Sequence, residues 1–139
     1  GLGSCVGVCI YDPGSKTAGM AHVMLPENTS KKEHAGMPGR YADSAIEILV
    51  EMMIAEGAVP GRMEVRIGGG AQMLSAPGLS DKFNIGSRNV ESVKAELTRM
   101  QLTLKGEDTG GQSGRTLTMD AATGTVTVKS LGAPGPTTL

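Results

Sequence analysis

The stretch "VGVCIYDPGSKTAGMAHVML", residues 6–25, decides how the chain begins to fold. Residues 6–11, "VGVCIY", alternate and are rich in β-branched side chains, which is typical of a strand. The following "DPGSK" supplies turn chemistry, because proline fixes φ, glycine permits positive φ and aspartate bonds its own backbone. A second apolar stretch over 18–25 ends at Pro26. The sequence therefore predicts a β-hairpin.

Small residues interrupt both strands of this hairpin, at Gly7, Gly19 and Ala21, which indicates that other elements pack closely against it. Beyond the hairpin, helical spacing and short apolar runs alternate. The predicted elements are a polar loop over 26–40, a helix over 41–57, a strand over 63–70, a helix over 84–102 capped by Ser87, a strand over 102–108, and a closing hairpin of 116–120 and 125–131. This order predicts one α+β domain over 1–139, with 132–139 as a frayed, flexible tail.

The composition of the chain argues against several classes of function. The 139 residues are 39% hydrophobic, enough for a core, but with one Phe, no Trp and nine Met that core is built from aliphatic side chains. A net charge of −1 without a basic stripe argues against nucleic acid. Because no apolar run approaches the ~20 residues that cross a bilayer, no membrane insertion is expected. Two cysteines without disulfide-scaffold spacing favour the cytoplasm.

Cys5 precedes the first strand and has four interpretations: a core residue, half of a disulfide, a metal ligand or a nucleophile. An extended 5–9 segment separates Cys5 from Cys9 by about 13 Å, whereas a disulfide needs Cα atoms within roughly 7 Å. Cys9 lies between two apolar neighbours and is interpreted as a buried small hydrophobe. Neither CxxC nor HxxxH spacing is present, so no metal is expected.

The predicted hairpin brings a histidine near Cys5. A turn centred on 13–14 gives partners whose numbers sum to 27–29, which places Cys5 opposite His22, Val23 or Met24. Only the first register puts thiol and imidazole directly across, where Cβ atoms are about 5 Å apart. An imidazole that takes the thiol proton makes cysteine a nucleophile. From the residues alone, a catalytic pair and two structural side chains both remain open.

Four other features have a structural and a functional interpretation. "IGGGAQM" (67–73) lacks the GxGxxG spacing and the Lys of a nucleotide loop, so we expect a tight turn and no cofactor. "NIGSRN" (84–89) contains Asn84, Arg88 and Asn89 and is either an anion- or carbonyl-binding helix start or merely a cap. "GEDTGG" (106–111) is a binding loop or a turn with two acids. His34 is expected to be a solvated loop residue.

Six blocks, taken together, resemble the chemoreceptor glutamine deamidases, the CheD family. They are "GLGSCVGVCIYD", "GMAHVMLP", "GRYADSAIEILV", "IGGGAQM", "NIGSRNV" and "GEDTGG", which extend over most of the chain in the family's order and spacing. The resemblance implies a cysteine hydrolase that converts glutamine side chains on bacterial chemotaxis receptors to glutamate and releases ammonia. It also implies mixed, sandwich-like β-sheets covered by two main helices, similar to the catalytic domain of the cytotoxic necrotizing factors.

Carried over by position, the family's nucleophile falls on Cys5 and its histidine on His22. The family's third catalytic residue, a threonine, would precede Gly1 together with the strand that carries it, and we expect that strand to be missing here. Backbone N–H groups near Ser4 are the candidates for the oxyanion site. Loops 26–40 and 71–84 are expected at the rim of the site.

The resemblance also implies a rival role from a different class. Members of the family bind and stimulate a CheC-type chemotaxis phosphatase, so the chain is alternatively an adaptor without catalysis. Phe83, in "SDKFNIG", would suit partner binding if exposed, or belongs to the core. A third interpretation is a related hydrolase that cleaves a glutamyl methyl ester.

Overall fold

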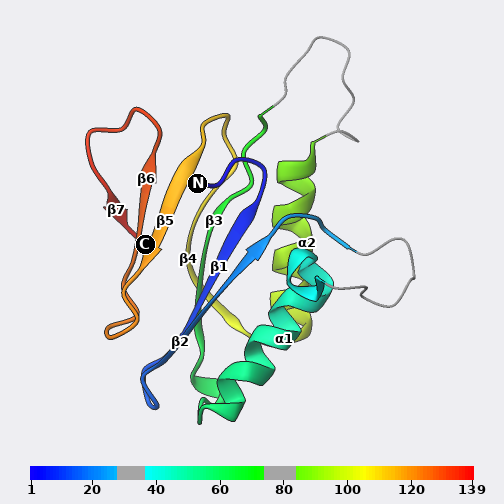
Figure 1. Ribbon diagram of the computed structural model, residues 1–139, viewed down its shortest axis with the longest axis vertical. Helices are drawn as coiled ribbons and strands as arrows, with labels where there is room; N and C mark the ends of the chain where they lie inside the picture. Colours follow the sequence, from blue (N-terminus) through cyan, green and yellow to red (C-terminus); the bar gives the residue numbers. More distant parts are fainter. Residues whose placement is uncertain (28–36, 74–83) are drawn as a thin grey trace.

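The computed structural model describes residues 1–27, 37–73 and 84–139 (Figure 1). Seven strands, two α-helices and two short 3-10 helices make up these residues. In chain order they are β1 (Val6–Asp12), β2 (Thr17–Val23), η1 (Pro38–Arg40), α1 (Ala42–Ala55), η2 (Pro60–Arg62), β3 (Glu64–Gly69), α2 (Ile85–Arg99), β4 (Thr103–Thr109), β5 (Arg115–Met119), β6 (Val126–Ser130) and β7 (Thr137–Thr138).

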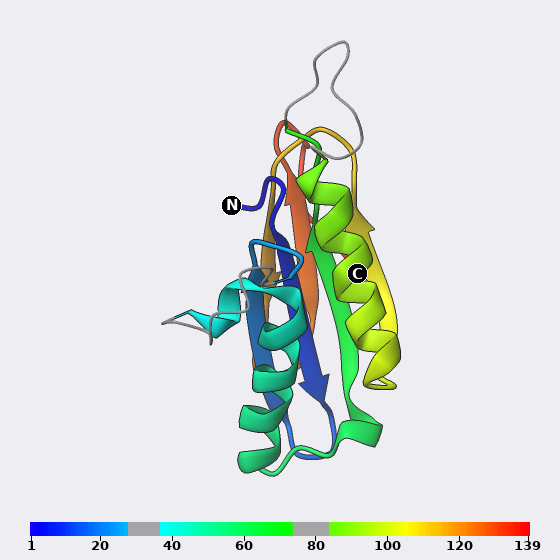
Figure 2. The same ribbon diagram turned by 90° about the vertical axis from the view of Figure 1, so that its right-hand side faces the viewer.

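The elements form three layers. A four-stranded sheet in the order β2-β1-β3-β4 lies in the middle, with both helices on one face and the sheet β5-β6-β7 on the other (Figures 1 and 2). The central sheet is mixed, because β3 and β4 are parallel while β1 is antiparallel to both its neighbours. The outer sheet is antiparallel. The predicted α+β class, with mixed sheets and two helices, is confirmed.

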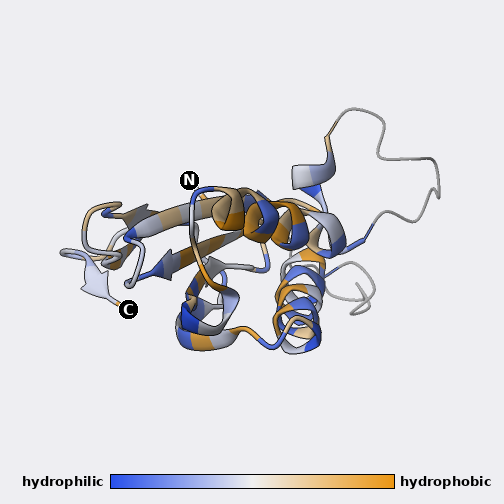
Figure 3. Cartoon of the chain, turned by 90° about the horizontal axis from the view of Figure 1, so that it is seen from below, coloured by the Kyte–Doolittle hydropathy of each residue, from blue (hydrophilic) through white to orange (hydrophobic). Residues whose placement is uncertain are grey.

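Strand β1 is buried at all seven positions, which explains its near-continuous apolar sequence. One face, formed by Val6, Val8 and Ile10, joins the core beneath the helices. That core also contains buried residues of β2, β3 and the two helices: Val23, Ala42, Ala45, Ile46, Leu49, Val50, Met53, Val65, Ile67, Val93 and Leu97. Both helices carry alternating hydrophobic and hydrophilic residues, as expected for helices with one buried side (Figure 3).

The small residues of the hairpin do admit close packing. A Cβ on Gly7 would lie 2.7 Å from Leu117 Cδ2 of β5, so this glycine makes room for the outer sheet. A Cβ on Gly19 would lie 2.7 Å from Leu49 Cδ1 of α1, on the opposite face. Substituting either with a larger residue would push a neighbouring layer away.

Element ends differ from the sequence prediction by up to three residues, and three of the differences have a clear physical reason or change the fold. The N-cap of α2 is Asn84, whose Oδ1 accepts a hydrogen bond from the Ser87 N–H at 3.0 Å, so the prediction of Ser87 as the cap is wrong. Strand β2 ends at Val23 rather than at residue 25, because the Met24 N–H bonds to the Arg40 carbonyl instead of β1. The frayed tail expected over 132–139 instead contains β7, which pairs with β6.

Asp12 closes the end of the hairpin opposite Cys5. This fully buried carboxylate accepts hydrogen bonds from Arg62 Nε and Nη2 and from the Val59 N–H, each at 2.9 Å. It also binds Gly14 and Ser15 within its own turn. These donors, the Arg62 guanidinium foremost, hold the pKa of Asp12 well below its usual value.

We therefore expect an acid-dependent contribution of Asp12 to stability. A carboxyl group with a lowered folded-state pKa stabilises the fold above its unfolded pKa of about 3.9, and the stabilisation is lost as the pH falls below it. The melting temperature of Asp12→Asn should lie well below that of the wild type at pH 7, and the difference should shrink from about pH 4 downward. Thermal unfolding monitored by circular dichroism across pH checks this, with the exposed Glu51→Gln as control. A difference independent of pH would contradict the assignment.

Candidate functional site

The hairpin register fixes where His22 lies. His22 pairs with Gly7 and Met20 pairs with Cys9, so partner numbers sum to 29, within the predicted range of 27–29. The register that would set Cys5 directly opposite His22 is not the one found. Because side chains alternate along a strand, the face that His22 shares with Gly7 is the face away from the helices.

Cys5 lies one residue before β1, at the end of the central sheet where the antiparallel neighbours β2 and β3 finish. Its carbonyl accepts a hydrogen bond from the Gly70 N–H at 2.8 Å, which continues the β1–β3 pairing by one step. Extending the alternation of β1 puts Cys5 on the same face as Gly7 and His22. In a regular antiparallel ladder, a diagonal pair of this kind has Cα atoms about 7–8 Å apart, a separation that a thiol and an imidazole can bridge.

The two cysteines have different surroundings. Cys5 is partly exposed, and burial raises the pKa of its thiol while its own backbone N–H acts in the opposite direction. Cys9 is 1% exposed, and burial raises the pKa of its thiol to about 11 against the smaller effect of Arg66. The expected burial of Cys9 is confirmed. Since the raised pKa leaves the Cys5 thiol protonated at neutral pH, its use as a nucleophile needs a base, and His22 is exposed to solvent on that face.

Two glycines at the end of β3 let the backbone approach Cys5. Gly69 and Gly70 have φ values of +113° and +69°, in the region that glycine adopts without strain. A Cβ on Gly69 would collide with the Cys5 carbonyl oxygen, and one on Gly70 would collide with Val90 of α2. The tight turn predicted for "IGGGAQM" is not found as such, because its first three residues belong to β3 and residues 70–73 carry no assigned turn. Its glycines allow the close contacts with Cys5 and α2.

Ser4 is held from the helix side. Its carbonyl accepts a hydrogen bond at 2.9 Å from the side-chain amide of Asn89 in α2. A pocket of about 90 Å³ lies beside Ser4 and the start of α2. From the sequence, Asn89 is predicted only as part of a helix start. In the structure, Asn89, Val93 and Leu97 follow one another at intervals of four on the buried side of α2. A polar residue within that apolar stripe is the signal that could have singled it out.

Both acids of "GEDTGG" are paired within the fold. Glu107 forms an ion pair with Lys94 at 2.8 Å, and this lysine lowers the pKa of Glu107. Asp108 forms an ion pair at 2.6 Å with Arg115, which is 6% exposed and also donates to the Asp108 and Gly110 carbonyls. These contacts favour a structural role for the stretch, but its first four residues lie in β4 and not in a turn.

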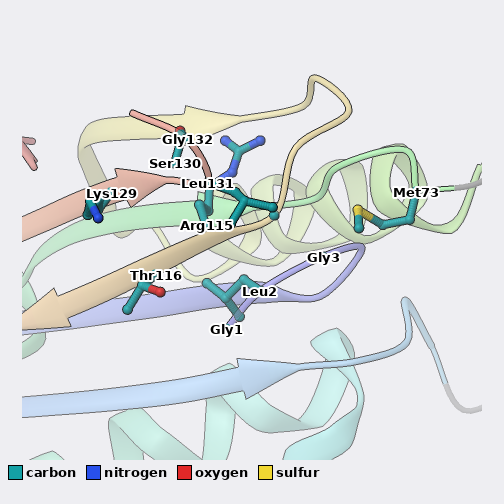
Figure 4. A pocket seen from close by; sticks show the side chains of 11 residues that line it. Gly1, Leu2, Gly3, Met73, Arg115, Thr116, Lys129, Ser130, Leu131 and Gly132 are labelled. Carbon is teal, nitrogen blue, oxygen red and sulfur yellow. The ribbon is translucent and has the colours of Figure 1, made fainter. Parts of the chain in front are cut away.

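A larger pocket, of about 340 Å³, lies between the first three residues and the β5–β6 edge (Figure 4). Leu2 forms one wall, where its backbone pairs with that of Arg115 in β5. Neither Cys5 nor His22 lines this pocket. It is therefore a neighbour of the site and not the site itself.

Comparison with known proteins shows which family this chain belongs to. The family model described as CheD chemotactic sensory transduction matches residues 24–130. A probable chemoreceptor glutamine deamidase CheD of Geobacillus kaustophilus is 45% identical over 131 residues, covering 94% of this chain and 79% of the relative. The chemoreceptor glutamine deamidase CheD of Thermotoga maritima is 45% identical over 132 residues, covering 95% and 80%. This chain belongs to the CheD family.

Several predicted features of this CheD-family chain lie outside the described residues. They are Phe83, His34 and most of the two rim loops, 28–36 and 74–83. Within residues 1–27, 37–73 and 84–139, no three His, Cys, Asp or Glu side chains gather closely enough to hold a metal ion. In the same parts of the chain, no helix combines the length and apolarity needed to cross a bilayer.

Thiol labelling should separate the two cysteines. We expect iodoacetamide to alkylate Cys5 in the native CheD-family protein and to reach Cys9 only after unfolding, because Cys9 is 1% exposed with a pKa of about 11. Peptide mapping by mass spectrometry, with and without urea, measures both rates. Equal labelling of the two thiols under native conditions would contradict this picture.

Gly69→Ala should be strongly destabilising. The positive φ and the collision with the Cys5 carbonyl predict a loss of more than about 1 kcal/mol in the free energy of unfolding, measured by urea denaturation. Gly61→Ala is the matched control, because a Cβ there meets no atom within 4 Å and should change stability by less than about 0.5 kcal/mol. Equal effects at both positions would be evidence against the close approach.

Proposed function

We propose that this chain is a chemoreceptor glutamine deamidase, with Cys5 as the nucleophile and His22 as the base. The proposal is supported by a partly exposed thiol directly before β1 and an exposed imidazole on β2 at the same end of the hairpin, while the other cysteine is buried. The names of the relatives agree with this chemistry. We further propose that the fold is similar to the catalytic domain of the cytotoxic necrotizing factors.

The mechanism follows from the state of the thiol. Because the pKa of Cys5 is raised, His22 removes the thiol proton as the sulfur attacks the carboxamide carbon of a glutamine. Backbone N–H groups near Ser4 and Cys5 stabilise the oxyanion, and such a donor is worth ~10²–10³ in rate. The imidazolium then gives its proton to the departing ammonia. Water, deprotonated by His22, hydrolyses the thioester and releases glutamate with the free thiol.

The surroundings of His22 suit a protein substrate. Met20 precedes it by two residues on the same face of β2, Met24 follows it by two residues just beyond the end of the strand, and the methionines are 48% and 45% exposed. Exposed methionines adapt to irregular apolar surfaces. An open, apolar surface of this kind fits a glutamine that projects from a receptor helix better than it fits a free small molecule. The reducing cytoplasm would keep the Cys5 thiol free for this reaction.

The test is incubation of receptor cytoplasmic fragments with the wild type, Cys5→Ala and His22→Ala, followed by mass spectrometry for conversion of glutamine to glutamate. We expect conversion by the wild type, none above background by Cys5→Ala, and a loss of at least about 10²-fold by His22→Ala. Cys9→Ala, which removes the buried thiol, is the matched control and should remain active.

Other outcomes would favour the alternatives. Conversion by Cys5→Ala at the wild-type rate would refute the proposed nucleophile. Stimulation of a CheC-type phosphatase by both the wild type and Cys5→Ala, with no glutamine converted by either, would support the adaptor role. Cleavage of glutamyl methyl esters without deamidation would indicate the related hydrolase.

A further inference from the structure

The β1–β2 ladder stops one residue short of Cys5. Its last pair is Val6 with Val23, and the next register position would join Cys5 to Met24. Met24 has left the ladder there, because its N–H bonds to the Arg40 carbonyl at 2.8 Å. The two strands therefore fork immediately before the candidate nucleophile.

A single side chain bridges the fork. The Asn89 amide nitrogen donates one hydrogen bond to the Ser4 carbonyl at 2.9 Å and another to the Met24 carbonyl at 3.0 Å. Both partners are backbone carbonyls, which can only accept hydrogen bonds. The atom that faces them must therefore be the NH₂ nitrogen of the Asn89 amide, and both protons of that group are used. Ser4 directly precedes Cys5, and Met24 follows His22 by two residues.

We propose that Asn89 is the positioning residue of this site, setting the separation of Cys5 and His22 by tying together the segments that carry them. The inference rests on the proposed function, since it assigns Asn89 to the same thiol–imidazole pair. Asn89 touches neither the thiol nor the imidazole in any hydrogen bond between described residues, so it acts through the backbone at Ser4 and Met24.

The burial of Asn89 indicates that this residue positions the Ser4 and Met24 segments and does little to stabilise the fold. The side chain is 0% exposed, and its Oδ1 has no hydrogen-bond partner among the described residues. A buried acceptor without a partner weakens a fold. Asn89 also sits in the stripe of α2 that continues with Val93 and Leu97, where leucine would be the ordinary occupant. Only a donor of two protons joins both carbonyls across the fork.

The test compares Asn89→Leu with Val93→Ala. Val93 lies one turn further along the same buried side of α2 and is also 0% exposed, so its truncation weakens the packing without touching the fork. We expect Asn89→Leu to lower kcat for receptor-fragment deamidation by about 10²-fold with KM nearly unchanged, since a displacement of about 1 Å has this effect and Asn89 does not face the substrate. Val93→Ala should lower the melting temperature and leave kcat unchanged.

A double-mutant cycle with His22→Ala supplies a readout that does not depend on deamidation. The measured quantity is the rate of Cys5 alkylation by iodoacetamide near pH 8. If Asn89 acts by setting the thiol–imidazole geometry, Asn89→Leu slows alkylation severalfold in the wild-type background and has no further effect in His22→Ala. Should Asn89→Leu fail to fold, Asn89→Ser, whose hydroxyl can donate to only one carbonyl, takes its place.

Two results would overturn the inference: an equal effect of the Asn89 substitution in both backgrounds, or an equal loss of kcat in Val93→Ala and Asn89→Leu at matched melting temperatures. The proposed function fails separately, if the wild type converts no receptor glutamine. In that case the alkylation cycle still decides whether Asn89 couples Cys5 to His22.

Discussion

The burial of β1 between two layers is the constraint on which the rest of this structure depends. Its valine and isoleucine face supports the helices, while Gly7, on the other face, makes room for Leu117 of the outer sheet. A strand packed on both faces cannot shift without opening both interfaces at once. Cys5 therefore extends from the most enclosed element of the fold, and its exposure to solvent begins only where that element ends.

Local chemistry in the sequence was enough to predict most of the elements. Apolar alternation located β1, helical spacing located α1 and α2 to within a few residues, and the apolar neighbours of Cys9 indicated its burial. What the sequence could not provide depends on distant partners. The pairing of β7 with β6 and the choice of one register from three involve groups outside the local pattern.

The residues of the candidate site also differ in whether the sequence could predict them. Cys5 and His22 could be connected from sequence because the turn brings both to the same end of one hairpin, and two of its three possible registers give them a shared face. Asn89 could not be connected to them, since its acceptors at Ser4 and Met24 lie 85 and 65 positions away along the chain. The helical period identifies which residues of α2 face inward, but it does not show which backbone carbonyls from other segments will accept hydrogen bonds from them.

The carboxylate that closes the hairpin turn has a consequence for how this family can vary. Because Asp12 binds Gly14 and Ser15 within the turn and Arg62 and Val59 outside it, the length of the turn is set from two directions. Adding or deleting one residue there would rotate β2 by half a strand repeat and carry the imidazole to the helix side. Only a change of two residues in the turn would keep the imidazole on the face of the thiol, so the pair depends on an even change in the number of residues between them.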